Sequence, residues 1–533
     1  FKSIFDRLRK DSMADFTREE IEEKLEEYVE LLAAREEEED EFIDEPEEEI
    51  QAAISETAVG EEEENPDDKK DEAVEEVAEE SILAVAEEAL VAVVEDEEPG
   101  LETIFEGKDL SELDLSGLNF HGISLQKTNL KKTNLSNCTL AESNLDEANM
   151  DQANLSDADM ENISCLEGIM TRANMEAINL QGAKLLGTDF SESNMERGNF
   201  RRSKSMDSKL VKCNLSDTDF SSSDFSRANF TDAKITDSDL SRARFNNAIF
   251  ERTNFTDSRL SMGVFFEADF KKADLNRALI KGAKLAGGNF TDAHLARADI
   301  TGADLTDARF HNADLSRAKL NGAILRRTDL KDSDLSEADL NIADLTGANL
   351  VGAKLAGANL DRIKLNQAKL NGAQLSGARM TKAKLTQVDL TGADLSGANL
   401  TGAELNEAVL EGADLSRANL TEAILINTNL KNTFLIGANL QKANLEGANL
   451  EGADLAGTKL RNATLQNANL KQVDLRRSDL EHADFSKAKL NSANFTGAKM
   501  SECLFAGADL TGAKMDSADT TDTQFEGAIG FKA

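Results

Sequence analysis

An aliphatic or aromatic residue stands at every fifth position through most of this chain. In residues 391–420 these positions are Leu395, Leu400, Leu405, Leu410, Leu415 and Leu420. Five residues of α-helix turn about 500°, so successive leucines would step roughly 140° around the axis and form no apolar stripe. In a continuous strand, residues five apart point to opposite faces. The spacing therefore excludes both a helix and a long strand.

The pattern is explained if each five-residue unit is a short extended piece followed by a corner. In the unit ADLSG, Ala and Leu stand two apart, so both side chains point inward while the Asp between them points outward. The next two residues, here Ser-Gly and elsewhere Thr-Gly, Ser-Arg or Thr-Asp, favour turns. Repetition of this unit predicts a coil wound around an apolar interior.

The repeat, A(D/N)LXX, resembles that of the pentapeptide-repeat family from about Phe105 to Phe525. Every fifth residue in this range is Leu, Phe, Met or Ile except Cys165, Ser205 and Thr520, which gives 85 pentapeptides without insertion or deletion. The resemblance implies an all-β solenoid, a right-handed quadrilateral β-helix with four pentapeptides per coil. About 21 stacked coils would follow. At strand spacings of about 4.8 Å, the rod would be roughly 100 Å long.

If each coil takes twenty residues, residues twenty apart stack on one another. We therefore predict two aromatic columns on adjacent sides of the rod and one ladder of asparagine side chains. The columns comprise Phe230, Phe250, Phe270, Phe290 and Phe310, and Phe225, Phe245 and Phe265; the ladder comprises Asn134, Asn154, Asn174, Asn194 and Asn214.

The charge is concentrated before the repeat. The net charge is −42, and residues 1–100 hold 40 acidic and 9 basic residues, which leaves 61 acidic and 50 basic residues for the rest. We divide the chain into an acidic, partly disordered arm (1–71), an apolar capping helix with a Pro-Gly break (72–100) and the repeat region (101–533). The rod itself is only mildly acidic, so direct nucleic-acid binding is not expected.

The N-terminal arm contains several candidate segments. Thr17 and Glu20 form a capping box before an apolar stripe, which predicts a helix near 18–35. The acidic runs 36–49 and 61–72 read as solvated linkers. The apolar stretch 72–94 is predicted to cover the exposed N-terminal edge of the solenoid. Residues 1–10 fit either a membrane-surface or partner-docking helix or the ragged end of a truncated one.

The sequence offers no pattern for catalysis, a cofactor or a metal. The histidines fall in outward positions far apart, and the cysteines fall in inward positions without ligand or disulfide spacing; these residues are His121, His294, His311 and His482, and Cys138, Cys165, Cys213 and Cys503. We therefore expect no enzyme activity. Neither a membrane-spanning run nor a secretory signal is visible, so a cytoplasmic location is expected, with delivery by a secretion system as an alternative.

Apolar residues at outward positions are the candidate docking sites for a partner protein. Leu166, Leu186 and Met206 each follow a central position and should form one strip on successive coils. Phe266 lies further along the same line, and a second group comprises Ile424, Ile426, Phe434 and Ile436. Contiguous exposed apolar surface often marks a binding site. The alternative is that these side chains fold over a corner and pack there.

The leading functional hypothesis is a rigid, non-catalytic scaffold that docks other proteins. Two alternatives follow from resemblance. Some members of the pentapeptide-repeat family resemble duplex DNA and protect DNA gyrase, but this rod is weakly charged, has no inserted loops and has no evident dimerisation helix after Phe525. The opening EGKDLSELDLSGLNFHG is similar to repeat segments associated with contractile, type VI secretion systems, which suggests an accessory or effector protein.

Overall fold

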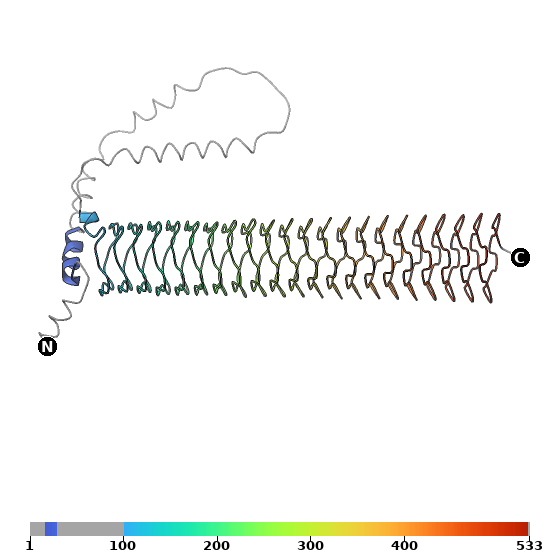
Figure 1. The fold of residues 1–533 in the computed structure, drawn as a ribbon, viewed down its shortest axis with the longest axis horizontal. Coiled ribbons are helices and arrows are strands. Elements are labelled where there is room, and N and C mark those ends of the chain that lie inside the picture. The colour runs from blue at the N-terminus through green and yellow to red at the C-terminus, as the bar shows by residue number, and fades with distance from the viewer. Residues whose placement is uncertain (1–15, 29–100, 531–533) are drawn as a thin grey trace, which may run out of the picture.

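The computed structural model describes residues 16–28 and 101–530, and the structural statements below concern these residues. Residues 18–28 form an α-helix, and Leu101–Thr103 form the 3-10 helix η1. From Asp109 to Ile529 every fifth residue makes an isolated parallel bridge. In Figure 1 these turns of chain stack into a straight rod, with the helix across its N-terminal end.

The bridges define the register of the coil. Each joins a residue to the one twenty positions later, from Asp109 with Asn129 to Asp509 with Ile529. At Leu395, the N–H donates to the Asp414 carbonyl at 2.7 Å. The described rod has no longer strands because a corner interrupts each extended piece. The predicted coil of four pentapeptides is therefore confirmed.

We number the four sides of the coil by their central inward residues. The first side holds Phe105, Leu125 and every twentieth residue after them. The second side starts at Leu110, the third at Leu115 and the fourth at Phe120. Each side ends in a corner of two residues.

The corners are tight turns that constrain the backbone. At one corner of the third side, the Ala398 N–H donates to the Leu395 carbonyl at 3.0 Å, and Gly397 has a φ of +66°. A positive φ at the second corner residue is the pattern of a type II turn, which favours glycine. Ile342 adopts the same conformation at a φ of +56°. Because β-branched residues rarely do so, this corner is strained.

The interior is filled as the five-residue pattern predicts. Ala393 and Leu395 are fully buried, while Asp394 between them reaches the surface. Ring centroids along the column Phe230, Phe250, Phe270, Phe290 and Phe310 lie 5.1, 4.9, 4.7 and 4.5 Å apart. Those of Phe225, Phe245 and Phe265 lie 5.6 and 5.2 Å apart. Both aromatic columns are therefore confirmed.

The predicted asparagine ladder is also present on the third side. Each amide NH₂ donates to the amide oxygen one coil earlier, at 2.9, 3.0, 3.4 and 2.8 Å along Asn134, Asn154, Asn174, Asn194 and Asn214. The ladder adds side-chain bonds to the backbone bonds between these coils, as in other stacked β-structures.

The helix at residues 18–28 begins with a reciprocal capping box. The Thr17 N–H donates to the Glu20 carboxylate at 2.7 Å, and the Glu20 N–H donates to the Thr17 hydroxyl at 3.3 Å. The apolar stripe of Ile21, Leu25 and Tyr28 is buried in the same core as the first coils.

This helix covers the exposed edge of the first coil. The Phe16 ring packs edge-on against Phe105 with centroids 5.7 Å apart. The Arg18 guanidinium donates to the carbonyls of Asp114 at 3.1 Å and Ser116 at 3.3 Å. In later coils such carbonyls accept N–H groups from the preceding coil. Arg18 thus satisfies acceptors that the ladder leaves open at its start.

Several predictions concern residues outside the described ranges. These are the docking helix at 1–10, the end of the helix at 29–35, the acidic runs 36–49 and 61–72, and the capping helix at 72–94.

Candidate docking surface

The predicted apolar strip lies along one corner of the rod. The Glu167 N–H donates to the Leu186 carbonyl at 2.9 Å, and the Gly187 N–H donates to the Met206 carbonyl at 3.0 Å. Leu166, Leu186 and Met206 therefore occupy equivalent places on three successive coils, at the corner that follows the first side. Leu186 is 39% exposed, while Leu166 and Met206 are half-buried. Solvent therefore reaches all three side chains, but those of Leu166 and Met206 are partly covered at the corner.

The interior beneath the strip also departs from the repeat. Cys165 and Ser205 fill central positions of the first side. Gly168 is required here because a Cβ at that position would collide with the Cys165 sulfur. Within the described structure, the buried hydroxyls of Ser203 and Ser205 have no hydrogen-bond partner. Such groups cost stability, so these coils are not optimised for packing alone.

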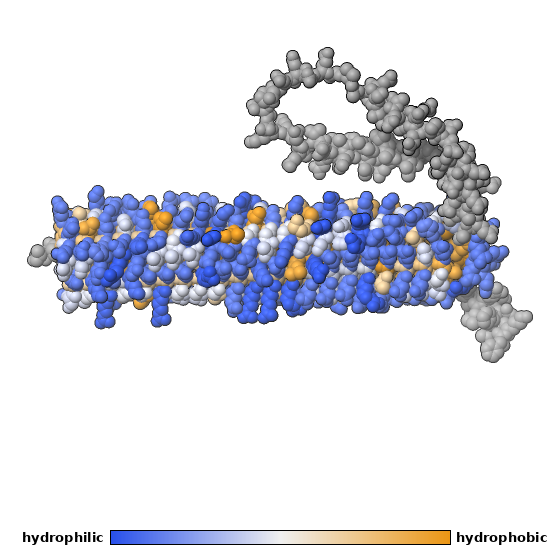
Figure 2. All heavy atoms as spheres, turned by 180° about the vertical axis from the view of Figure 1, so that it is seen from behind, coloured by the Kyte–Doolittle hydropathy of each residue, from blue (hydrophilic) through white to orange (hydrophobic). Residues whose placement is uncertain are grey.

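The other predicted docking residues lie apart from the strip. Phe266 is 38% exposed at the same corner, three coils beyond Met206. Ile424 and Ile426 belong to the first side and its corner, eleven coils beyond the strip. Phe434 and Ile436 are 50% and 45% exposed on the third side and the corner that follows it. Figure 2 shows the same pattern, in which apolar surface forms separate patches on a hydrophilic rod.

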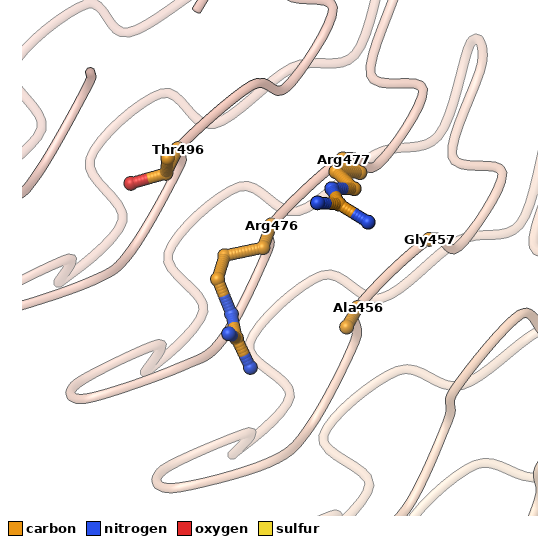
Figure 3. A pocket seen from close by; sticks show the side chains of 5 residues that line it. All are labelled: Ala456, Gly457, Arg476, Arg477 and Thr496. Carbon is orange, nitrogen blue, oxygen red and sulfur yellow. The ribbon is translucent and has the colours of Figure 1, made fainter. Parts of the chain in front are cut away.

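Two shallow depressions lie along the corner that follows the third side. One, of about 420 Å³, is lined by Ser396, Gly397, Ser416, Arg417 and Ile436. The other, of about 530 Å³, is lined by Ala456, Gly457, Arg476, Arg477 and Thr496. In Figure 3, Arg476 and Arg477 stand on one coil, with Gly457 and Thr496 on the neighbouring coils. Both hollows are lined by small corner residues beside at least one arginine.

Seven exposed large apolar residues lie outside the predicted docking set, and two of them stand at the second position of a corner. Met262 is 62% exposed and Ile342 is 53% exposed, both at the corner that precedes the first side. Each occupies the second corner position, with φ near +60°. The second corner position usually holds Gly or a polar residue. A large apolar residue at this position in the sequence therefore indicates exposed apolar surface.

The described residues show no constellation for acid–base or metal chemistry. Among 16–28 and 101–530, no group of three or more His, Cys, Asp or Glu side chains could hold a metal ion. The most buried carboxylate among the ion pairs, Asp151, accepts a hydrogen bond from Arg172, with Nε to Oδ1 at 3.0 Å. Burial alone would raise the pKa of Asp151, but hydrogen bonds from Arg172, Thr171, Gln152 and Lys131 lower it below the usual range. Its charge is neutralised within the rod.

The cysteines are enclosed in the core. All four are free and buried. Burial raises the pKa of Cys138 to about 11 and those of Cys165, Cys213 and Cys503 to about 12. The Cys138 thiol donates to the Leu115 carbonyl at 3.0 Å. These thiols therefore have the environment of small core residues rather than of nucleophiles.

We expect the native protein to resist thiol alkylation. Because the thiolate is the reactive form, iodoacetamide at about pH 8 should modify none of the four cysteines in the folded chain. After unfolding in guanidinium chloride, all four should react. Intact mass spectrometry measures both results. Rapid modification of Cys165 in the native protein would contradict its placement in the core.

The comparisons with known proteins agree with this geometry. A family model described as Pentapeptide repeats matches segments between residues 123 and 452, and a second, described as Pentapeptide repeat region, matches residues 440–515. No curated protein matches the chain. Among the described residues no helix is long and apolar enough to span a membrane.

Several solved structures are similar to parts of the chain. HetL, a pentapeptide repeat protein involved in heterocyst differentiation regulation in Nostoc sp. strain PCC 7120, is 32% identical over 43% of this chain and 90% of its own, with a TM-score of 0.17. QnrB1, a plasmid-mediated fluoroquinolone resistance protein, is 19% identical over 38% of this chain and 89% of its own, with a TM-score of 0.24. Rfr23 from the cyanobacterium Cyanothece 51142 is 24% identical over 24% of this chain and 90% of its own, with a TM-score of 0.14.

Proposed function

Because this chain belongs to the pentapeptide repeat family, we propose that its rod of about 21 coils is a non-enzymatic scaffold that docks a partner protein. The rod is rigid because every interior coil is bonded to its two neighbours along all four sides. A rigid solenoid presents side chains at fixed spacing over a long surface, which suits it for recognition.

One observation carries the proposal: Leu166, Leu186 and Met206 occupy equivalent corner positions on three neighbouring coils, with Leu186 exposed and the other two half-buried. Single exposed apolar residues are common on protein surfaces, but a row of them is not. Inward Ala, Leu and Phe residues already fill the core, so the strip is not needed to complete it. Its best-supported role is contact with another molecule.

Replacement of the strip by serine should weaken partner binding and leave the fold intact. The variant Leu166→Ser/Leu186→Ser/Met206→Ser keeps the inward core, and its melting temperature should change little. Loss of the apolar contacts should raise the Kd for a partner isolated from the native host at least about tenfold. Circular dichroism and titration calorimetry measure the two effects.

A matched control separates site-specific binding from general stickiness. Leu279, on the fourth side, is 38% exposed, almost the same as Leu186 at 39%. Leu279→Ser should leave the Kd unchanged, whereas Leu186→Ser should raise it. Equal binding by the strip variant and the native chain would remove the strip as the docking site. A large fall in stability would show that these side chains serve the core.

The alternatives have less support. Duplex DNA carries about one negative charge per 1.7 Å. The rod has 50 basic residues against 61 acidic ones, so its charge resembles that of DNA poorly. No observation on the described residues favours the secretion-system hypothesis.

A further inference from the structure

The first side carries a cluster of cationic side chains between residues 184 and 284. Between residues 184 and 284, six exposed cations on this side and the corner before it make no ion pair within the described ranges. They are Lys184, Arg202, Lys204, Arg242, Arg244 and Lys284. In the same coils the outward column of the third side holds Asn194, Asn214, Lys234, Asn254, Asp274 and His294. That column of the third side therefore holds a single cation, Lys234.

At other corners, several cations of the rod pair with acids one coil earlier. Arg227 binds Asp207 at 2.6 Å, Arg277 binds Asp257 at 2.5 Å and Arg327 binds Asp307 at 2.6 Å. These are exposed pairs of modest individual strength. They show the usual arrangement, in which a carboxylate lies one coil away from each guanidinium.

In the outward column of the first side, by contrast, two cations are direct neighbours. Lys184 forms a bridge directly with Lys204, so two like charges lie on adjacent strands. Like charges at opposed positions destabilise a sheet. Further along the column, Arg244 is separated from Lys204 only by Asp224. An anion bound on this side would relieve the repulsion.

The cations lie beside the apolar strip. Lys184 and Leu186 belong to one coil, as do Lys204 and Met206, and in each coil only an inward residue separates them. Two coils with Ser226 and Asn246 follow in the apolar column, and beyond them lie Val264 and Phe266 and then Lys284. Five coil spacings of about 4.8 Å make this mixed surface roughly 24 Å long. An extended peptide of about seven residues would span it at 3.3 Å per residue.

We infer that the docking surface binds an acidic segment of a partner protein that also carries large apolar side chains. This inference rests on the proposed docking function and assigns the partner's chemistry. The carboxylates would lie over Lys184, Lys204 and Arg244, and the apolar side chains would cover the strip. A nucleic-acid strand fits less well, because Leu186 and Met206 offer no aromatic surface on which bases could stack.

The test uses the full chain and a fluorescent synthetic peptide, EEDEFIDEE, as probe. Anisotropy should show binding that weakens as sodium chloride is raised from about 50 mM to about 500 mM. Replacement of Phe-Ile by Ser-Ser in the peptide should weaken binding, and so should replacement of its acids by Gln and Asn. The variant Lys184→Gln/Lys204→Gln/Arg244→Gln should bind the acidic peptide at least about tenfold less tightly.

Three cations on the other sides provide the matched control. Lys234, Lys319 and Lys369 are exposed on the third, fourth and second sides. Their replacement by glutamine removes the same charge and should leave the Kd unchanged. Both triple variants should keep the native melting temperature, because none of these residues contributes to the core.

The outcomes separate this inference from the proposed function. Equal loss of binding in the two charge variants, no binding by the acidic peptide, or tighter binding of a twelve-nucleotide oligo(dT) would overturn the acidic-segment assignment. If instead the charge variant binds the native-host partner normally while the strip variant does not, docking stands and only the partner's acidity is wrong. If neither variant affects that partner, the proposed site itself fails.

Discussion

Replacement of Leu395 by aspartate should lower the free energy of unfolding by at least about 4 kcal/mol. Leu395 is fully buried among the leucines of neighbouring coils, where no cation can pair with a carboxylate. The new charge must remain buried, become protonated or open the coil. Since coils contact only their neighbours, hydrogen exchange should rise in coils near residues 375–415 and change little near Phe225. Guanidinium titration measures the global effect.

The next residue along the chain supplies the control. Ser396 begins the corner and reaches the surface. Ser396→Asp introduces the same carboxylate one position later and should change stability by less than about 0.5 kcal/mol. Similar losses in both variants would contradict the inward and outward assignment on which the fold depends.

Replacement of Phe270 by alanine should cost about 3–5 kcal/mol. Phe270 lies in the middle of the aromatic core, with ring centroids 4.9 Å from Phe250 and 4.7 Å from Phe290. It also contacts Phe255 and Phe265 on the adjacent sides. The rigid backbone ladder prevents the coils from closing around the missing ring, so a cavity should remain. Chemical denaturation and amide exchange measure the loss.

Phe266 is the matched control for this change. It is the same residue type only four positions earlier, but it is 38% exposed at a corner. Phe266→Ala should cost less than about 1 kcal/mol, because more than a third of this residue already contacts water in the folded chain. A larger loss from Phe266→Ala than from Phe270→Ala would show that the assignment of sides is wrong here.

The sequence predicted most of the rod because the repeat leaves little freedom. An uninterrupted five-residue spacing determines which side chains point inward, and a coil of twenty residues then determines which ones stack. The columns through Phe270 and Asn174 follow directly, and the structure has both. The same reasoning placed Leu166, Leu186 and Met206 on one corner. It missed Met262 and Ile342, because it did not consider large apolar residues at the second corner position.

The sequence could not specify how far the strip is exposed. Leu186 is exposed, whereas Leu166 and Met206 are half-buried. Packing at a corner depends on rotamers and on the residues beneath it, here Cys165 and Ser205. Whether a lysine or arginine forms an ion pair also depends on side-chain rotamers and on the neighbouring residues. The twenty-residue register predicts that Lys184 lies next to Lys204. Only the side-chain positions in the structure show that no carboxylate forms an ion pair with either lysine.

By itself, then, the sequence determined the side, the register and the column of each residue in the repeat, since these depend only on local periodicity. The tertiary structure alone decided what covers the first coil. An amphipathic helix requires an apolar surface but does not specify which one. Residues 18–28 have that role in the described structure because Ile21, Leu25 and Tyr28 fit the cut end of the core. Arg18 also reaches the open carbonyls of Asp114 and Ser116, a match that depends on three-dimensional distance and not on periodicity.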